Sequence, residues 1–294
     1  MGEMTRLLSG KAQAGSVPPG FVITAQVFDH FLRENNLTEK IQLALNQTNP
    51  QNTDAVEKIS KKIRSLIESS PTPPTLAKEF VEIYTQLASE FVAVRSSATA
   101  EDSNIASWAG ELESYLFTTK ETLLENIKKC WSSLFTPRAI FYRFEKNLQK
   151  EKVSVAVVVQ KMVKSDISGI IFTVHPVTKD PNQLIIEAAW GLGEAIVGGM
   201  VTPDSYVVDK RDWSIVDIYQ ADQDFKVAFK PGGGSHEICL DENEKGQKLT
   251  GEQIIEIAKL AQKIEDHYNM PMDIEFAIED NTVYIVQARP ITTL

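Results

Sequence analysis

Residues 272–294 read MDIEFAIEDNTVYIVQARPITTL, in which polar and apolar residues alternate over two runs. Alternation with a period of two predicts β-strands, because successive side chains on a strand point to opposite faces. The segment Asp280-Asn281-Thr282 separates the two runs. Asparagine suits the left-handed backbone that such a turn often requires. The segment is therefore predicted to form an antiparallel β-hairpin.

The pairing of this hairpin sorts its side chains into two faces. With an odd turn, which we take as Asp280-Asn281-Thr282, Glu275 lies opposite Gln287 and Asp273 lies opposite Arg289. An even turn sets polar residues against apolar ones, so we predict the odd turn. The predicted apolar face then consists of Ile274, Phe276 and Ile278 on the first strand and Tyr284, Val286 and Ala288 on the second.

The predicted polar face has two interpretations. A carboxylate and an amide carbonyl, here Glu275 and Gln287, offer the oxygen ligands that Mg²⁺ accepts alongside waters and phosphate oxygens. Arg289 carries a guanidinium that can bind the same phosphates in a bidentate manner. The alternative is a solvent-facing side of the hairpin with an ordinary Asp273–Arg289 pair, and the pairing pattern alone leaves both open.

Composition limits the classes of function. The 294 residues carry a formal net charge of −10 and are 43% hydrophobic and 24% charged, which is ordinary for a globular protein. An acidic chain is a poor general binder of nucleic acid, because phosphate backbones attract basic surfaces. Two cysteines do not make a disulfide framework. No signal peptide or long apolar run is recognisable, so we expect a cytoplasmic protein with no membrane partner.

Helical and strand patterns mix along the chain without strict alternation. The most β-branched run, VSVAVVVQKMV at 153–163, predicts a central strand. The run TGEQIIEIAKLAQKIEDHY at 250–268 predicts a long helix with Thr250 at its N-terminal cap. This mixture favours an α+β fold over a doubly wound α/β sheet.

Three further segments carry candidate binding groups. Arg95 ends a buried strand beside a loop of small residues, which suits either a polyphosphate or a salt bridge with Glu101 or Asp102. Met162 ends the central strand and suits either an adenine ring or the core. The run GLGEAIVGG at 191–199 suits either an anion at a helix N-terminus or close packing, because it lacks the full spacing of a dinucleotide fingerprint.

Taken together and in this order, the segments closely resemble the ATP-binding domain shared by phosphoenolpyruvate synthase, pyruvate phosphate dikinase and rifampin phosphotransferase. The stretches that carry the resemblance are VPPGFVIT, VRSSATAEDSNIASWAGELESYL, VVVQKMV, SGIIFTVHPVT, EAAWGLGEAIVGGMVTPDSYVV and MDIEFAIEDNTVYIVQARPITT. The resemblance implies an ATP-grasp fold of α+β class, with two lobes and a nucleotide cleft between them. We assign residues 1–163 to the N-terminal lobe and residues 164–294 to the C-terminal lobe.

The resemblance also implies a set of site residues and two cofactors, ATP and Mg²⁺. Arg95 and Arg289 resemble the phosphate-binding, catalytic arginines, and Glu275 and Gln287 resemble the metal and nucleotide ligands, with Asp273 as an outer member. The remaining nucleotide-binding positions are Gly110 and Ser114 in a lid segment, followed by Gln160, Lys161, Met162 and Val163 at the adenine hinge. Relatives often have Thr where this chain has Ser114, and Gln where it has Glu111.

Two departures from the family pattern affect the functional prediction. The lysine of a GGKG-like loop is not found at its usual distance before PPGF, and Lys11 is the nearest substitute. None of the four histidines lies in a recognisable phosphohistidine motif. We therefore expect a dikinase-type phosphotransferase domain that depends on a histidine in a separate domain or subunit, with pyruvate as the downstream acceptor. The alternatives are a rifampin-phosphotransferase-like antibiotic kinase and a non-catalytic ATP-binding module.

Overall fold

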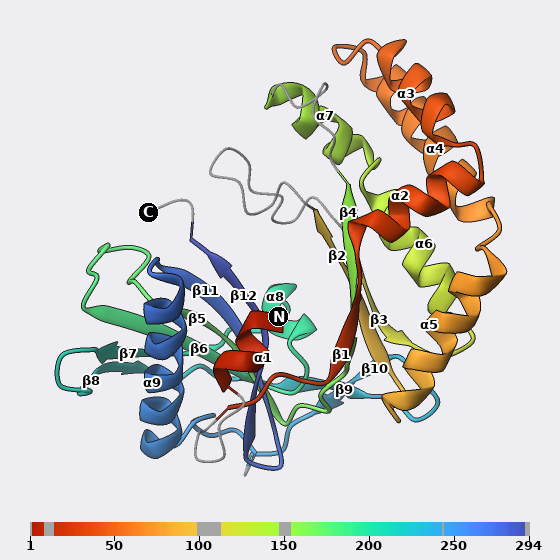
Figure 1. Cartoon of the computed structure of the whole chain (residues 1–294). Coiled ribbons are helices and arrows are strands. Elements are labelled where there is room, and N and C mark those ends of the chain that lie inside the picture. The colour runs from red at the N-terminus through yellow and green to blue at the C-terminus, as the bar shows by residue number, and fades with distance from the viewer. Residues whose placement is uncertain (1, 9–14, 99–112, 147–153, 243, 292–294) are drawn as a thin grey trace. The chain divides into compact units, whose positions relative to one another are not determined.

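The computed structural model describes residues 2–8, 15–98, 113–146, 154–242 and 244–291 (Figure 1). The chain divides into two compact units. We call residues Pro19–Met162 the N-terminal unit, and Met1–Pro18 together with Val163–Leu294 the C-terminal unit. Each unit has its own sheet and its own hydrophobic core, so each is described separately.

The N-terminal unit contains a four-stranded antiparallel sheet in the order β1-β4-β2-β3. Its strands are β1 (Gly20–Ile23), β2 (Val92–Ala98), β3 (Ser114–Thr118) and β4 (Val155–Lys161). Its helices are α2 (Ala25–Glu34), α3 (Thr38–Asn46), α4 (Thr53–Ser69), α5 (Pro74–Gln86), α6 (Leu123–Ser133) and α7 (Pro137–Glu145). The predicted central strand is confirmed as β4, which pairs with β1 on one side and β2 on the other.

The core of this unit forms where the apolar side of the helices meets the sheet. Trp131 on α6 is fully buried and packs against the rings of Phe28 and Phe31 on α2. Val157 and Val159 of β4 belong to the same cluster. β-Branched residues favour strands and fill such an interface efficiently, which explains why this run forms the middle of the sheet.

The C-terminal unit contains a six-stranded antiparallel sheet in the order β12-β11-β5-β6-β7-β8. Its strands are β5 (Ile167–Phe172), β6 (Gln183–Trp190), β7 (Asp204–Asp209), β8 (Ile215–Tyr219), β11 (Met272–Glu279) and β12 (Thr282–Pro290). A separate hairpin pairs β9 (Phe225–Phe229) with β10 (Ser235–Cys239). The helices are α1 (Gly2–Leu8), α8 (Glu194–Val197) and α9 (Gly251–Tyr268).

Helix α9 covers one face of the six-stranded sheet (Figure 1). Its N-terminus has the predicted cap, because Thr250 and Gln253 each accept a hydrogen bond from the other's backbone N–H. Ile257 and Ile264 of α9 are fully buried in one cluster with Ile171 and Ile274 of the sheet. We call this side of the sheet the helix-covered face and the other side the far face.

The predicted lobe boundaries need correction at two places, at the start of the chain and at Val163, which the prediction places in the N-terminal lobe and which groups with the C-terminal unit. The sequence-based assignment places residues 1–18 in the N-terminal lobe, whereas in the structure they group with the C-terminal unit. Met4 and Leu8 of α1 are buried in the core beneath α9, and Ser16 pairs with Tyr284 of β12. Burial of these apolar residues against the sheet of the C-terminal unit is favourable because it removes them from water. That sheet is distant in sequence, so the local sequence pattern does not predict the contact.

The hairpin β11–β12 has the predicted pairs but not the predicted turn. Glu279 pairs with Thr282, so the turn has only Asp280 and Asn281, with φ angles of 50° and 59°. Such a left-handed pair fits the tight turns that match the twist of a hairpin. A β-bulge opposite the step from Glu275 to Phe276 then shifts the register by one residue.

The bulge also changes which residues of β12 reach the core. Val283 and Ile285 are buried on the helix-covered face, whereas Tyr284 and Val286 are only partly buried. The predicted apolar face is therefore wrong for Tyr284 and Val286, because the extra residue exchanges the two faces of β12 between the turn and the bulge.

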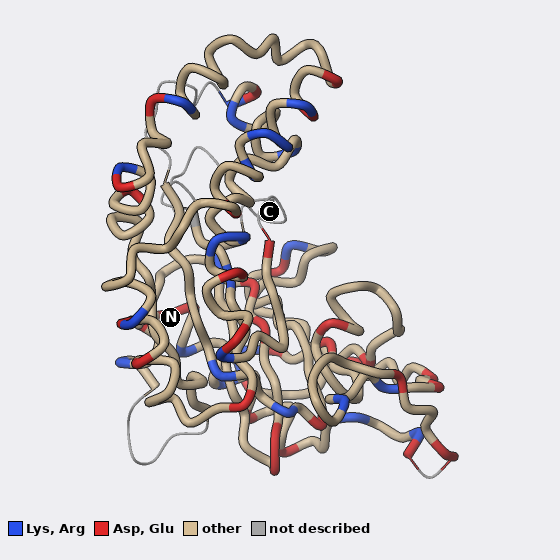
Figure 2. The backbone as a smooth tube through the Cα atoms, turned by 90° about the vertical axis from the view of Figure 1, so that its right-hand side faces the viewer, with Lys and Arg blue, Asp and Glu red and all other residues tan. Residues whose placement is uncertain are grey.

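The antiparallel sheets and the separate helices confirm the predicted α+β class. Figure 2 shows Lys and Arg interspersed with Asp and Glu along the traced backbone. Within the described part of the chain, no helix combines the length and the apolar character needed to cross a bilayer.

Candidate functional site

The hairpin β11–β12 brings together the four polar residues that the sequence predicted. Glu275 pairs with Gln287, and Asp273 pairs with Arg289. Directly opposed residues share a face, and alternation places all four on the far face, away from α9. All four side chains are partly buried. The predicted juxtaposition is therefore present, with two carboxylates, one amide and one guanidinium in adjacent positions.

Arg289 is held by Asp273. Its Nε and Nη2 atoms both donate to Oδ2 of Asp273, at 2.8 and 2.7 Å. The side chain of Asp273 is 14% exposed and that of Arg289 is 41% exposed. Charge-assisted contacts of this kind fix the orientation of a guanidinium. The Asp273–Arg289 ion pair expected for a solvent-facing hairpin is therefore present. The same pair also holds Arg289 in a defined orientation beside Glu275 and Gln287.

Glu187 extends this polar group, and sequence reasoning missed it. It pairs across the sheet with Ile170, which in turn pairs with Glu275. Two strand spacings separate the two glutamates, which is about 10 Å. Burial raises the pKa of Glu187 above its ordinary value. The available signal was an acidic residue inside the otherwise apolar run LIIEAAW, and perturbed carboxyls of this kind concentrate at functional sites.

Glu187→Gln is expected to raise the thermal stability of the protein near pH 7 and to leave it unchanged near pH 4. A raised folded-state pKa means that the folded protein disfavours the charged carboxylate, so wild-type stability falls as the pH rises from the unfolded pKa of about 4.3 through the folded value. A neutral amide removes that cost. Melting curves at both pH values measure the effect, with exposed Glu256→Gln as the charge control. Equal or lower stability of the Glu187→Gln variant at pH 7 would contradict the expectation.

In the N-terminal unit, the structure pairs Arg95 with Ser114 across strands β2 and β3. Both belong to the predicted phosphate-binding set, so two members far apart in sequence become direct neighbours. Gly110 lies outside the described residues, as do Lys11 and the alternative partners Glu101 and Asp102 of Arg95.

The predicted adenine hinge comprises the last two residues of strand β4 and the two residues that follow it. Gln160 is 3% exposed and pairs with Ala93 and Gly20, and the backbone N–H of Lys161 donates to Pro19 at 2.8 Å. Met162 is partly buried, and its sulfur accepts the backbone N–H of Phe117 at 3.0 Å. Met162 therefore serves the packing of β3, whichever further role it has.

Val163 follows directly as the first residue of the second segment of the C-terminal unit. The residues of the predicted hinge are thus contiguous in sequence but divided between the two units.

The glycine segment before α8 is explained by packing. Helix α8 has only four residues, Glu194–Val197. Gly191 has a φ of 89°, and a Cβ there would collide with the carbonyl oxygen of Val227. Only glycine permits this approach at a positive φ, so Gly191 is required by its contact with the strand β9. Of the two interpretations of this segment, the structure supports close packing.

The candidate metal ligands on the hairpin β11–β12 are oxygen donors of two kinds, a carboxylate and an amide. Among the residues that the structure describes, no group of three or more His, Cys, Asp and Glu side chains is arranged to hold a metal ion. Glu275 and Gln287 lie directly opposite each other on the two strands, and they supply one carboxylate and one amide oxygen. This donor set fits Mg²⁺, which takes one or two carboxylates and completes its shell with water and phosphate oxygens.

Comparison with known proteins identifies relatives along the whole chain. The family model described as pyruvate phosphate dikinase, AMP/ATP-binding domain, matches residues 1–294. A probable phosphoenolpyruvate synthase of Methanocaldococcus jannaschii is 43% identical, with 95% of this chain and 24% of that protein aligned. Its counterpart in Archaeoglobus fulgidus is 44% identical, over 95% of this chain and 38% of that protein.

A rifampicin phosphotransferase of Bacillus cereus is 37% identical over 100% of this chain and 33% of its own length. The chain thus spans less than half the length of these curated relatives. Among solved structures, D-alanyl-alanine synthetase A from Vibrio cholerae aligns with 79% of this chain and 54% of its own at 12% identity, with a TM-score of 0.34. That structural likeness is too weak to support any functional argument.

Proposed function

Because the chain belongs to the family of pyruvate phosphate dikinase AMP/ATP-binding domains, we propose that it is the nucleotide-activating part of a phosphoenolpyruvate-synthase-type phosphotransferase. In this proposal the domain has the ATP-grasp arrangement and binds ATP together with Mg²⁺. It activates the nucleotide for phosphoryl transfer to a histidine on a separate domain or subunit, and the phosphoryl group then passes to pyruvate.

The observation that carries the proposal is the register of the hairpin β11–β12. It sets Glu275 opposite Gln287 and Asp273 opposite Arg289, so that the residues proposed as metal ligands adjoin the guanidinium proposed to bind phosphate. Glu275 and Gln287 would hold the Mg²⁺ ion. When bound, the ion neutralises charge on the phosphate oxygens, which lowers the barrier to phosphoryl transfer.

The protein's own residues have distinct tasks in this function. Arg289, oriented by Asp273, binds phosphate oxygens and stabilises charge that develops during transfer. Arg95 performs the same task from strand β2, and the neighbouring Ser114 hydroxyl donates to a phosphate oxygen. Because a loose phosphoryl transfer needs little covalent help from the protein, alignment and charge neutralisation are the main contributions.

The adenine ring is assigned to the segment from Gln160 to Val163. Backbone amides and carbonyls at the end of a strand can pair with the edge of a purine, while apolar side chains contact its faces. The burial of Gln160 and the backbone hydrogen bonds from Lys161 to Pro19 and from Met162 to Phe91 fix the path of this segment; these two N–H groups are thereby occupied, so the purine would pair with other backbone groups of the segment.

A second acceptor class is supported by a specific similarity. The rifampicin phosphotransferase of Bacillus cereus aligns over the full length of this chain. Nucleotide activation is therefore compatible with either a pyruvate or an antibiotic acceptor, and the residues that choose between them are not among those assigned here. A non-catalytic ATP-binding module is the third possibility and differs in that no phosphoryl transfer occurs.

We expect the 294-residue chain to bind ATP in the presence of Mg²⁺ and to produce no appreciable phosphoenolpyruvate from ATP and pyruvate by itself. Isothermal titration with ATP, with and without Mg²⁺, measures the first expectation, and a coupled assay for phosphoenolpyruvate measures the second. An intact fold with no detectable ATP binding would reject nucleotide activation. Robust phosphoenolpyruvate production without any added protein would reject the requirement for a separate phosphohistidine carrier.

A further inference from the structure

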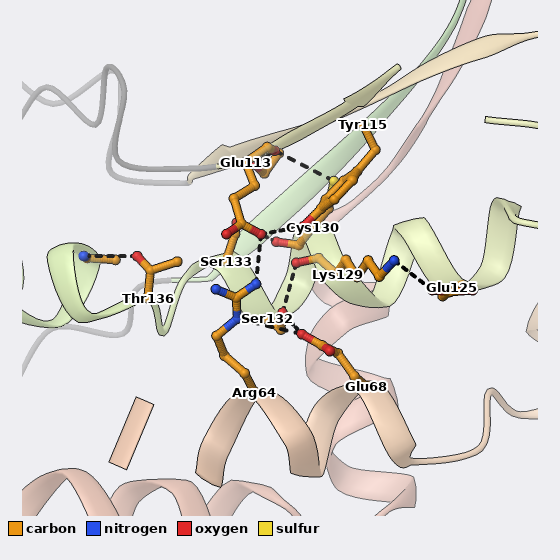
Figure 3. A network of polar contacts seen from close by, with 12 residues as sticks. Arg64, Glu68, Glu113, Tyr115, Glu125, Lys129, Cys130, Ser132, Ser133 and Thr136 are labelled. Carbon is orange, nitrogen blue, oxygen red and sulfur yellow. Dashed lines mark hydrogen bonds and ion pairs between the residues drawn. The ribbon is translucent and has the colours of Figure 1, made fainter. Parts of the chain in front are cut away.

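A polar network surrounds Glu113, the residue that immediately precedes Ser114 (Figure 3). Its carboxylate oxygen Oε2 accepts a hydrogen bond from Nη2 of Arg64 at 2.8 Å and another from the hydroxyl of Tyr115. Both side chains of the ion pair are about one-third exposed or less, at 26% for Arg64 and 34% for Glu113. The carboxylate is therefore held both from helix α4 and from strand β3, which begins at the next residue.

The backbone of Glu113 is held as well. Its carbonyl oxygen accepts the hydroxyl of Ser96 at 2.6 Å and the backbone N–H of Ser96 at 3.4 Å. The buried thiol of Cys130 on α6 lies 3.7 Å from the same oxygen and 3.4 Å from the carbonyl oxygen of Val94 on β2. Strand β2 and helix α6 thus fix the main chain at this residue, while α4 fixes its side chain.

The far end of the network connects two helices. Nε of Arg64 lies 3.6 Å from Oε1 of Glu68 one turn later on α4. The same carboxylate oxygen accepts the hydroxyl of Ser132 on α6 at 2.6 Å. Arg64 is therefore oriented by a group that is itself anchored on α6. Burial, and then the hydrogen bond to Glu113, raise the pKa of Tyr115, so its hydroxyl remains a donor throughout the physiological pH range.

Strand pairing alone specifies the position of Ser114 weakly. Strands β2 and β3 pair Arg95 with Ser114 and Val94 with Tyr115, and the register then shifts before Val92 pairs with Thr118. A short pairing next to an irregularity can slip, and a slip of one residue would turn each side chain to the other face. The contacts of Glu113 oppose that slip at the pair Arg95–Ser114.

We propose that Glu113 is a positioning residue for nucleotide binding, and that Arg64 and Tyr115 act through it. By fixing the start of β3 against β2, the network holds the Ser114 hydroxyl beside Arg95 in the arrangement that phosphate binding needs. This inference rests on the proposed ATP-binding function. It assigns a role to three residues that do not themselves touch the nucleotide.

The test compares ATP affinity and stability in matched variants of the full chain. Glu113→Gln keeps the shape of the side chain and removes its charge, and Arg64→Met removes the partner. Each is expected to raise the Kd for ATP with Mg²⁺ about tenfold, which lies within the usual range for coupling between a remote group and a ligand. The Kd for ATP of the double variant is expected to be no higher than that of either single variant, because both changes break the same link between Arg64 and Glu113.

Lys128→Met serves as the matched control. Its amine donates to the backbone carbonyls of Glu68 at 2.5 Å and Ser70 at 3.2 Å, so it also joins α6 to the end of α4, but through main-chain groups and not through the side chains of Arg64, Glu68 and Glu113. It is expected to lower the melting temperature and leave the Kd for ATP within about twofold of wild type. If Glu113→Gln and Arg64→Met lowered stability in the same way without changing the Kd, the network would serve the fold alone and the inference would fail.

The same titrations separate this inference from the proposed function. Absence of ATP binding by the folded wild-type chain would reject nucleotide activation, and the positioning role would fall with it. Normal wild-type binding with unchanged variants would reject the positioning role only. Additive losses in the double variant would also contradict it, because they would mean that Arg64 and Glu113 act independently.

Discussion

Glu275→Ala is expected to weaken ATP binding about 10–100-fold when Mg²⁺ is present, the range typical of losing a group that supports a metal site. Without Mg²⁺ the wild-type chain is expected to bind ATP weakly, and the variant is expected to have nearly the same affinity. The reason is that the carboxylate contributes through the metal ion, and an uncompensated carboxylate near phosphates repels them. Isothermal titration with and without Mg²⁺ measures the difference.

Glu279→Ala provides the matched control, since it removes the same functional group from the same strand. Glu279 pairs with Thr282 beside the turn, four residues from Glu275 and thus about 13 Å along the strand. Its replacement should leave the Mg²⁺-dependent part of the ATP affinity unchanged. Equal effects of the two substitutions would mean that general acidity matters and not a ligand position, and an unaltered affinity in Glu275→Ala would remove Glu275 from the ligand set.

The hairpin shows what can be predicted from parity, that is, from whether the number of residues between two paired positions is odd or even. It correctly predicted that Glu275 meets Gln287 and that Asp273 meets Arg289. It wrongly predicted a turn of three residues, because a turn of two residues followed by a bulge gives the same pairs beyond the bulge. Parity counts only the total number of unpaired residues between two positions. It therefore fixes the polar pairs near the strand ends and leaves the location of the extra residue undetermined.

Other features depended on contacts that are distant in sequence. The pairing of Arg95 with Ser114 follows from the sheet, and the family resemblance grouped the two residues without predicting that they are neighbours. The raised pKa of Glu187 results from burial on the assembled sheet. Met4 is buried in a core that is formed in part by strands near the other end of the sequence. Local periodicity contains no information on such partners, whereas it was sufficient for β4 and α9.

Lys248→Met is expected to lower the free energy of unfolding by about 3–5 kcal/mol, the usual cost of removing one partner from a buried ion pair. Lys248 and Asp204 are 1% and 0% exposed, and Nζ of Lys248 lies 2.8 Å from Oδ1 of Asp204. The carboxylate also accepts the hydroxyl of Tyr206 at 2.7 Å and the backbone N–H of Ala221 at 2.9 Å. Without the amine, a charged group remains buried with neutral donors only.

The position of this pair explains why the effect should reach the whole C-terminal unit. Lys248 also donates from its backbone N–H to Asp204, at 2.9 Å, and from Nζ to the carbonyl of Ala221, at 2.6 Å. The network thereby joins the start of β7 to the segment that leads into α9, whose burial forms the core. Chemical denaturation followed by circular dichroism measures the loss.

Lys245→Met is the appropriate control for this prediction. Lys245 lies three residues earlier and makes a pair of equal length, 2.8 Å, with Asp224, but the side chain of Asp224 is 82% exposed. Water solvates an exposed partner when its counter-ion is removed, so this substitution should cause no marked loss of stability. Equal losses in the two variants would show that burial does not set the cost, because the residue exchange and the ion-pair distance are the same. A large loss in the free energy of unfolding for Lys248→Met alone would show that the buried network contributes strongly to the stability of this unit.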